Sequence, residues 1–105
     1  MNFLYRIEEI LLLAIWKLGE QAYGAAIMKQ VEDDTETTWM SGAVYGSLTR
    51  LLKNGYIETL KNADQPEGVG RPRIYYKITK TGMEKLVALQ ELNRSLWDGI
   101  PDLKI

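Results

Sequence analysis

The residues best suited to chemistry in this sequence are the basic side chains of its middle third. Residues 41–80 contain seven Lys and Arg against three Asp and Glu, whereas residues 1–40 contain three against seven and residues 81–105 three against four. Lysine and arginine bind phosphate groups, and a surface that gathers them attracts nucleic acid. The net charge of the whole chain is −1. The basic block, rather than the overall charge, therefore predicts contact with a polyanion.

The residue types on which most enzymes rely are missing. The sequence has no Cys and no His, which removes thiolate nucleophiles, the usual zinc and haem ligands and the commonest general base. Its acidic residues form runs such as Glu32-Asp33-Asp34 rather than a pair beside a nucleophile. We therefore expect no enzymatic activity, no metal site and no cofactor.

The length of 105 residues suits one compact domain, and 46% hydrophobic with 26% charged residues is typical of a chain that folds. The longest apolar run, Ile10–Trp16, is far shorter than the roughly 20 residues of a membrane-spanning helix. The first residues lack the basic start and the cleavage site of a signal peptide. We expect a cytoplasmic protein with no membrane partner.

Hydrophobic periodicity and chain-breaking residues predict four helices. Apolar residues recur at helical spacing in four stretches, and glycine or polar residues bound each stretch. Ser41 is expected to cap the third helix, and either Thr79 or Thr81, the latter with Glu84 in a capping box, the fourth. The expected helices span 4–18, about 22–33, the stretch from Ser41 to Asn54-Gly55, and a last stretch that ends near Trp97.

Two segments with strand character, 56–61 and 73–78, flank the longest expected loop, 62–72. The loop is rich in glycine and proline and too long for a tight turn, so the hairpin should project from the body. Strict alternation in the second strand places Ile74, Tyr76 and Ile78 on one face and Arg73, Tyr75 and Lys77 on the other.

This order of elements predicts a fold that is mainly α with a small β-hairpin, a winged helix-turn-helix followed by a C-terminal dimerisation helix. In such folds the third helix enters the major groove of DNA and the hairpin, or wing, lies along the backbone. Residues 1–80 would form the DNA-binding domain and residues 81–105 the dimerisation helix and tail, within one compact domain. The alternative is a winged-helix protein-interaction module without DNA binding, because the same layout also serves protein binding.

The outer face of the predicted third helix is small in its first half and basic in its second. Small residues allow close approach to base edges, and later basic side chains meet phosphates. Gly46 costs about 1 kcal/mol relative to alanine inside a helix, which favours a functional reason for it. An ordinary solvated face with an indifferent glycine is the competing explanation. The outer face carries Gly42, Ala43, Gly46, Thr49, Arg50 and Lys53.

The hairpin supplies a second group of cations that are phosphate-contact residues by type. Glycines beside Arg71 would let it approach a minor groove or the backbone. A hairpin whose charges only keep it soluble is the alternative. The group comprises Lys61, Arg71, Arg73 and Lys77, with Tyr75 between them.

The last helix carries more apolar surface than one domain of this size can cover, which favours pairing with a second copy. Asn93 lies within its apolar stripe, where it either fixes the register of a dimer or is simply exposed. The residues expected at the dimer interface are Leu86, Leu89, Asn93, Leu96 and Trp97.

Three stretches resemble one family: AYGAAIMKQVE at 22–32, SGAVYGSLTRLLKNGYIE at 41–58 and GRPRIYYKITKTG at 70–82. In order and spacing they are similar to a short form of the PadR family of bacterial winged helix-turn-helix transcriptional regulators. The resemblance spans about residues 8–90. It implies a repressor that binds a palindromic operator in double-stranded DNA as a homodimer.

The resemblance also implies roles for individual residues. Tyr23 and Gly24 match the start of the family's second helix, near the phosphate backbone. Ser41, Ala43 and Tyr45 match the head of its recognition helix, and Gly70, Arg71, Arg73 and Tyr75 match its wing motif. The sequence departs from the family at Gly46, where proline or another small residue is frequent, and at Pro72, inside a stretch that is frequently basic.

Some members of the family are released from DNA by small aromatic or drug-like molecules bound near the dimer interface. By this resemblance, Trp16 and Trp97 are the candidates for lining a pocket for such an effector. The alternative is packing in the core, which is the usual place for a tryptophan on an apolar helix face.

Overall fold

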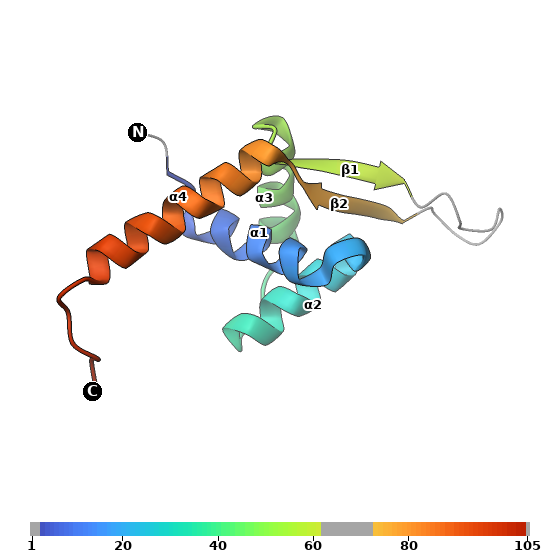
Figure 1. Ribbon diagram of the computed structural model, residues 1–105. Coiled ribbons are helices and arrows are strands. Elements are labelled where there is room, and N and C mark those ends of the chain that lie inside the picture. Colours follow the sequence, from blue (N-terminus) through green and yellow to red (C-terminus); the bar gives the residue numbers. More distant parts are fainter. Residues whose placement is uncertain (1–2, 62–72, 105) are drawn as a thin grey trace.

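The computed structural model describes residues 3–61 and 73–104 of the chain, with the side chain of Lys61 left out. These residues form four α-helices, a short 3-10 helix and a hairpin (Figure 1). The predicted fold class, mainly helical with one small hairpin, is confirmed. The elements are α1 (Arg6–Leu18), η1 (Gly19–Gln21), α2 (Gly24–Thr35), α3 (Ser41–Lys53), β1 (Ile57–Lys61), β2 (Ile74–Ile78) and α4 (Lys80–Trp97).

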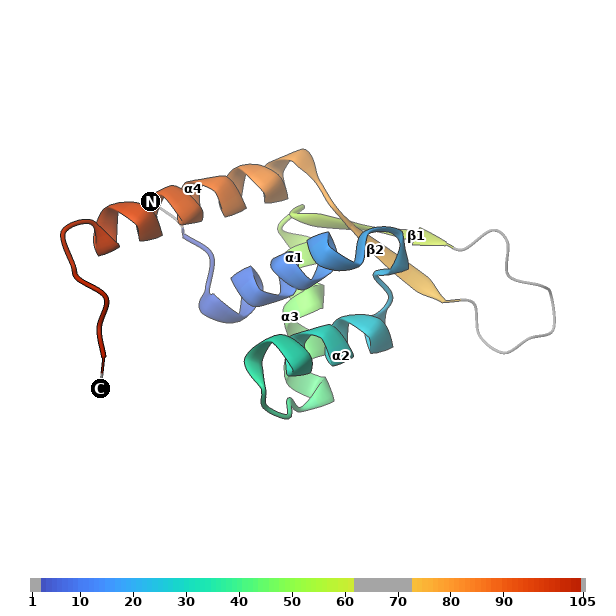
Figure 2. The ribbon, with the colours of Figure 1, turned by 60° about the horizontal axis from the view of Figure 1, so that its bottom comes forward.

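Helices α1, α2 and α3 pack around one apolar core, which the root of the hairpin closes from the side (Figures 1 and 2). The apolar stripes predicted from the sequence point into this core. Its largest fully buried side chains are Leu11, Leu12, Ile27, Val31, Val44, Leu48 and Leu51.

An exposed ion pair also joins the first two helices. The Lys17 ammonium lies 3.0 Å from an Asp34 carboxylate oxygen. This hydrogen bond lowers the pKa of Asp34 below its ordinary value, and a second hydrogen bond from Gln30 adds to the effect. The pair links the end of α1 to the end of α2 at the surface.

Two predicted helix starts differ from the structure. The prediction that Ser41 caps the third helix is wrong, because Met40 is the N-cap and Ser41 is the first helical residue. For the last helix, Thr79 rather than Thr81 is the cap, and its hydroxyl oxygen accepts a hydrogen bond from the Gly82 amide at 3.1 Å. The predicted glycine stop at Gly19 is confirmed, with a φ of 58° that glycine adopts readily.

The hairpin strands pair in antiparallel register, with Ile57 opposite Ile78 and Thr59 opposite Tyr76. Residues 22 and 23 extend this small sheet, because Tyr23 forms an antiparallel bridge with Tyr75 and the Tyr76 amide donates to the Ala22 carbonyl at 2.8 Å. The segment before α2 is therefore tied to the first half of β2.

Helix α4 starts from a tight joint with the turn that follows α3. The Thr79 hydroxyl donates to the Gly55 carbonyl at 2.6 Å, and the Thr79 amide donates to the Tyr56 carbonyl at 3.0 Å. Gly82 is buried directly against the Tyr56 carbonyl, where a β-carbon would collide with backbone. This close approach fixes the direction in which α4 leaves the body.

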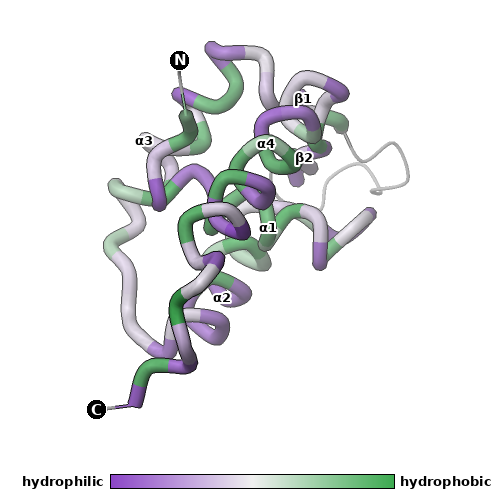
Figure 3. Tube along the Cα trace, turned by 60° about the vertical axis from the view of Figure 1, so that its left-hand side comes forward, coloured by the Kyte–Doolittle hydropathy of each residue, from purple (hydrophilic) through white to green (hydrophobic). Residues whose placement is uncertain are grey.

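The C-terminal half of α4 projects beyond the three-helix body, on the side away from the hairpin (Figures 1 and 2). Leu89 is buried in the single chain, and the Asn93 amide donates to the Glu9 carboxylate on α1 at 3.4 Å. Leu96 and Trp97 remain 60% and 58% exposed. Apolar and polar residues alternate along this helix and its tail (Figure 3). Within the described residues, no helix has the length and apolar character needed to cross a membrane.

Candidate nucleic-acid interface

The predicted outer face of α3 is exposed along the whole helix. Val44, Ser47, Leu48 and Leu51 turn inward, and this buried side holds the helix against the core. The outward side begins with small residues and ends with cations, as the sequence predicts. Its exposed members are Ser41, Gly42, Ala43, Tyr45, Gly46, Thr49, Arg50 and Lys53.

The two glycines of this face have no packing reason to be glycine. A β-carbon built on Gly42 or Gly46 would meet no atom within 4 Å. Both residues have ordinary helical backbone, so an alanine would fit each site without strain. Their smallness leaves a smooth strip of backbone that another molecule can approach closely.

The longer side chains of α3 are oriented by hydrogen bonds and ring contacts. The Thr49 hydroxyl donates to the Tyr45 carbonyl at 2.9 Å, which leaves its oxygen lone pairs facing outward as acceptors. Arg50 donates to the Ser47 hydroxyl at 3.2 Å, and its guanidinium lies 6.0 Å from the centre of the Tyr5 ring. These contacts hold Arg50 while leaving its remaining donors available.

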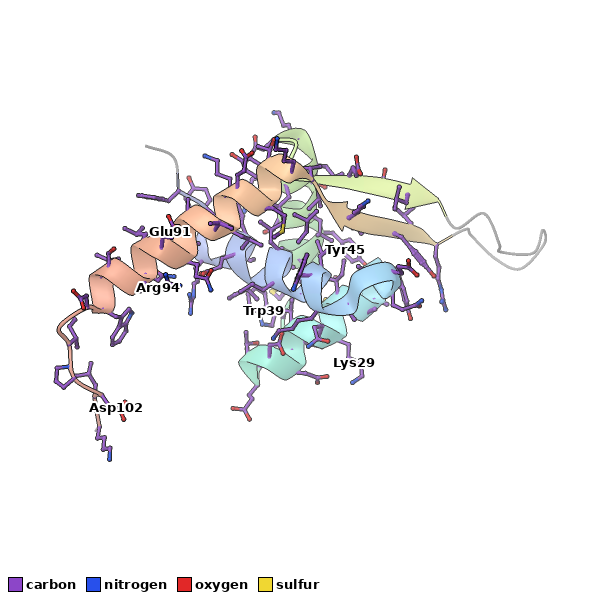
Figure 4. The ribbon with its side chains drawn as sticks, in the orientation of Figure 1. Lys29, Trp39, Tyr45, Glu91, Arg94 and Asp102 are labelled. Carbon is purple, nitrogen blue, oxygen red and sulfur yellow. The ribbon has the colours of Figure 1, made fainter. Side chains whose placement is uncertain are left out.

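Tyr45 joins α3 to the start of α2 (Figure 4). A β-carbon on Gly24 would lie 2.6 Å from the Tyr45 hydroxyl, so the tyrosine ring rests directly on the glycine backbone. Gly24 therefore has a packing role in addition to the one that the family resemblance implies. The contact brings α3 and the first turn of α2 to one surface.

Tyr23, Arg73 and Tyr75 form a cluster at the start of β2, toward the loop end of the hairpin. The Arg73 guanidinium lies 4.4 Å from the centre of the Tyr23 ring, and the two tyrosine rings meet edge to face at 5.6 Å. A hydrogen bond with Tyr75, helped by attraction to Tyr23, raises the pKa of Arg73 above its already high ordinary value. The guanidinium is thus a permanent positive charge held in place by the Tyr23 and Tyr75 side chains.

This cluster lies at the N-terminus of α2. Tyr23 is the N-cap of α2, and its side chain does not cap the helix amides. Backbone amides and the positive end of the helix dipole at such a terminus bind phosphate well. Through Gly24 and Tyr45, this terminus connects the face of α3 with Arg73. Three elements predicted separately to meet DNA therefore share one surface, which we term the basic face: the outer side of α3, the start of α2 and Arg73.

Arg50 and Lys53 on α3 differ from the cations of α1 and α2 in their ion pairs. Among the described residues, the recorded ion pairs are Arg6–Glu9, Lys17–Asp34 and Lys29–Asp33. No described acidic group neutralises Arg50 or Lys53 in this way. Lys77 is exposed but stands opposite Glu58 in the hairpin register, so its charge is partly offset. Arg50 and Lys53 thus leave positive charge on the exposed side of α3.

Three residues predicted to contact DNA from the wing lie, in whole or in their side chain, outside the described part of the structure. Gly70 and Arg71 lie outside the described residues. Lys61 ends β1 and pairs with Ile74, so the ladder does not set it opposite Tyr75 or Lys77. Of the predicted wing residues, only Arg73, Tyr75 and Lys77 are placed with their side chains.

The predicted contact set omits the turn between α2 and α3. Trp39 anchors this turn: its amide donates to the Glu32 carboxylate and its indole N–H donates to the Thr35 hydroxyl, both at 2.9 Å. The next residue, Met40, is 82% exposed. A large aromatic and a large apolar residue in an otherwise polar connection are the sequence signal that could have drawn attention to this turn.

The predicted effector residues do not meet within one chain. Glu9, near the start of α1, contacts Asn93, near the end of α4, so the two helices run antiparallel. Trp16 lies near the end of α1 and Trp97 at the end of α4, hence at opposite ends of the helix pair. Both side chains are exposed, at 64% and 58%.

Three helices followed by a hairpin, with basic residues on the outer side of the third helix, define the class of winged helix-turn-helix proteins. The sequence profile of the PadR-like family of transcriptional regulators matches residues 12–88. The chain therefore belongs to the PadR-like family. Members of this family are regulators rather than enzymes. A comparison with curated proteins gave no match.

Solved structures agree with this assignment. The chain is similar to a PadR family transcriptional regulator from Eggerthella lenta DSM 2243, with 26% identity, a TM-score of 0.67 and coverage of 87% of this chain and 77% of that one. It is also similar to a PadR family transcription regulator from hypervirulent Clostridium difficile R20291, with 26% identity, a TM-score of 0.65 and coverage of 85% and 88%. F93 from STIV, a winged-helix DNA-binding protein, shares the fold at 12% identity, with a TM-score of 0.71 and coverage of 93% and 98%.

Proposed function

We propose that this protein is a cytoplasmic transcriptional repressor that binds a palindromic operator as a homodimer. Each α3 would enter the major groove, and each wing would lie on the backbone or in the adjacent minor groove. The observation that carries this proposal is the basic face, because small residues, fixed cations and a helix N-terminus meet there on one side of the molecule.

The predicted DNA contacts include two groups that differ in chemistry. Ser41, Ala43 and Thr49, at the front of α3 or in its middle, have the size and the hydroxyl groups suited to base edges. Phosphate contacts would come from the cations and from the start of α2, which position the protein without carrying sequence information. The residues proposed to contact phosphates are Tyr23, Gly24, Arg50, Lys53, Lys61, Gly70, Arg71, Arg73, Tyr75 and Lys77.

The homodimer would form through the projecting part of α4. The exposed Leu96 and Trp97 support this assignment, whereas Leu89 and Asn93 already have partners within the chain. Residues 1–80 would then act as the DNA-binding domain and residues 81–105 as the dimerisation helix and tail. A two-fold dimer presents two recognition helices, which accounts for an operator with two-fold symmetry.

A small aromatic effector is the regulatory part of the proposal. Because Trp16 and Trp97 lie at opposite ends of the α1–α4 pair, a pocket lined by both requires the second chain. Planar aromatics should then quench tryptophan fluorescence saturably, and Trp97→Ala should abolish this quenching. If no compound of a broad aromatic panel quenches the protein, the effector proposal is wrong.

The test of function is selection of duplexes from a random library, followed by fluorescence anisotropy at two salt concentrations. The selected duplex should bind far more tightly than a scrambled one, contain inverted half-sites and weaken with added salt. A promoter that overlaps the selected site should lose transcription when the protein is added. Failure to bind any duplex at low salt would instead favour the protein-interaction module.

A further inference from the structure

Met40 combines two unusual properties at one position. It is the N-cap of α3, and at 82% it is the most exposed large apolar side chain of the described residues. Serine, threonine, aspartate and asparagine are preferred at N-caps because their oxygens accept a helix amide. Methionine offers no such acceptor, and no side-chain cap hydrogen bond is formed here.

The fold does not need an apolar side chain at this position. The Met40 carbonyl starts the helix by accepting hydrogen bonds from the Ala43 and Val44 amides, at 3.0 and 3.3 Å. Any residue supplies that carbonyl. Helix α4 joins the opposite end of α3, through the turn at Gly55 and Tyr56, so the start of this chain's own α4 lies away from Met40.

The turn presents Met40 from a rigid base. Trp39 packs against the core and is held by hydrogen bonds to Glu32 and Thr35. Thr35 in turn donates to the Val31 carbonyl at 2.7 Å. The backbone at Met40 is thus fixed on both sides, and its side chain extends from the front of α3.

Base chemistry in the major groove identifies the group that suits this side chain. Thymine presents a C5-methyl there, whereas the other bases present hydrogen-bond donors and acceptors. The residues that follow Met40 are Ser41, Gly42 and Ala43, all small and exposed, so they let the helix front approach the bases. A methionine side chain is unbranched and adapts its shape to an apolar neighbour.

We propose that Met40 is a specificity-determining residue that contacts a thymine methyl group in each half-site. The assignment rests on the proposed function, in which the front of α3 enters the major groove. It explains why a poor capping residue with a largely exposed apolar side chain stands at this point: the contact with DNA buries that side chain.

The test uses the full-length protein and a duplex selected by it from a random library. Thymines of one half-site are replaced singly by deoxyuridine, which removes only the methyl group. At one position this replacement should weaken binding about 4-fold, the equivalent of ~0.8 kcal/mol for one buried methyl-sized group. If no thymine position responds to loss of its methyl, the assignment is overturned.

Three variants test whether Met40 is the residue that causes the preference for thymine over uracil. Met40→Ser should bind thymine and uracil duplexes equally at that position and should unfold at a higher temperature, because serine restores a cap. Met40→Leu should keep the preference for thymine. Leu103→Ser, which removes an exposed apolar side chain from the C-terminal tail, should also keep it. A thymine preference that persists in Met40→Ser overturns the role of Met40.

Failure of the proposed function and failure of the Met40 contact give different experimental results. If the wild-type protein enriches no sequence from the library, the proposed function is wrong and the inference falls with it. If a sequence is enriched but Met40→Ser discriminates thymine from uracil as well as the wild type does, only the inference is wrong.

Discussion

Gly46 lies in the middle of the exposed side of α3, where its missing side chain leaves open space. An alanine there would improve helix propensity by about 1 kcal/mol. We expect Gly46→Ala to raise the thermal unfolding midpoint by roughly 4–8 °C, the usual shift per kcal/mol for a domain of this size. The same methyl would hold the helix away from base edges, so operator affinity should fall about tenfold, within the range for one base contact.

Calorimetry and anisotropy on the same Gly46→Ala sample separate these two effects. Gain of stability with loss of DNA affinity is the expected combination, because the fold and the ligand favour different residues at this site. If Gly46→Ala binds the selected duplex as tightly as the wild type does, the glycine is an indifferent part of a solvated face.

Arg73 is the wing cation whose geometry is described, held over the Tyr23 ring at the start of α2. Arg73→Ala should weaken binding to every duplex and reduce the slope of log K against log salt by about 1.8, because the homodimer loses two phosphate contacts at about 0.9 each. Lys104→Ala removes the same charge from the C-terminal tail and should leave the slope unchanged. A slope that stays constant in Arg73→Ala, or a loss confined to one sequence, would contradict the assignment to phosphate.

At the scale of elements, the joint between α3, β1 and α4 depends on Gly82. A β-carbon there would collide with the Tyr56 carbonyl, which is backbone and cannot swing aside. We expect Gly82→Ala to lower the free energy of unfolding by about 1–3 kcal/mol, as overpacking usually does. Gly42→Ala, in open space, is the matched control and should not destabilise the protein. Denaturant unfolding gives the free energy of unfolding of both variants. Equal values would show that the backbone at this joint shifts to accommodate a β-carbon at little cost.

The sequence predicts the elements well because burial imposes a period on them. Ile27 and Val31 recur along α2 at the spacing of one helical turn, and this pattern survives any change in the surface. The start of α3 was harder to predict: a capping preference is worth only about 1 kcal/mol, and the anchored Trp39 decides where the chain turns. Local preference therefore placed the cap one residue too late, at Ser41.

The candidate site was predictable in part for a similar reason. Exposure of the outer side of α3 follows from its helical period, so six of its exposed residues could be named from the sequence, and the family resemblance added Ser41 and Tyr45. The contacts of Tyr45 with Gly24 and of Arg73 with Tyr23 join residues that are far apart along the chain. No local pattern encodes these contacts, and only the packed fold brings the three elements to one face.

On the scale of the whole molecule, the chain is more extended than a closed domain. The Cα radius of gyration is 15.7 Å, against ~13 Å for a compact chain of about 100 residues. The projecting half of α4 contributes to this extension and carries exposed Leu96 and Trp97 (Figures 1 and 2). Surface of this kind is typical of an interface between subunits.

Leu96→Glu should therefore yield folded monomers, because the side chain is exposed in the single chain and its charge would lie in the dimer interface. Leu89→Glu is a poorer test, since Leu89 is buried in its own chain and the variant would lose stability as well. Sedimentation equilibrium gives the mass, and Leu60→Glu, an exposed site on the hairpin, serves as the control. A Leu96→Glu protein that still sediments as a dimer would remove α4 from the interface.

The central claim is that duplex DNA binds the basic face formed by α3, the start of α2 and Arg73. Titration of the ¹⁵N-labelled protein with the selected duplex tests it most directly, because every backbone amide reports separately. The account predicts the largest shifts at residues 40–53, at Tyr23 and Gly24, and at residues 73–77. Shifts confined to α4 and the C-terminal tail, or none on adding excess duplex at low salt, would contradict it.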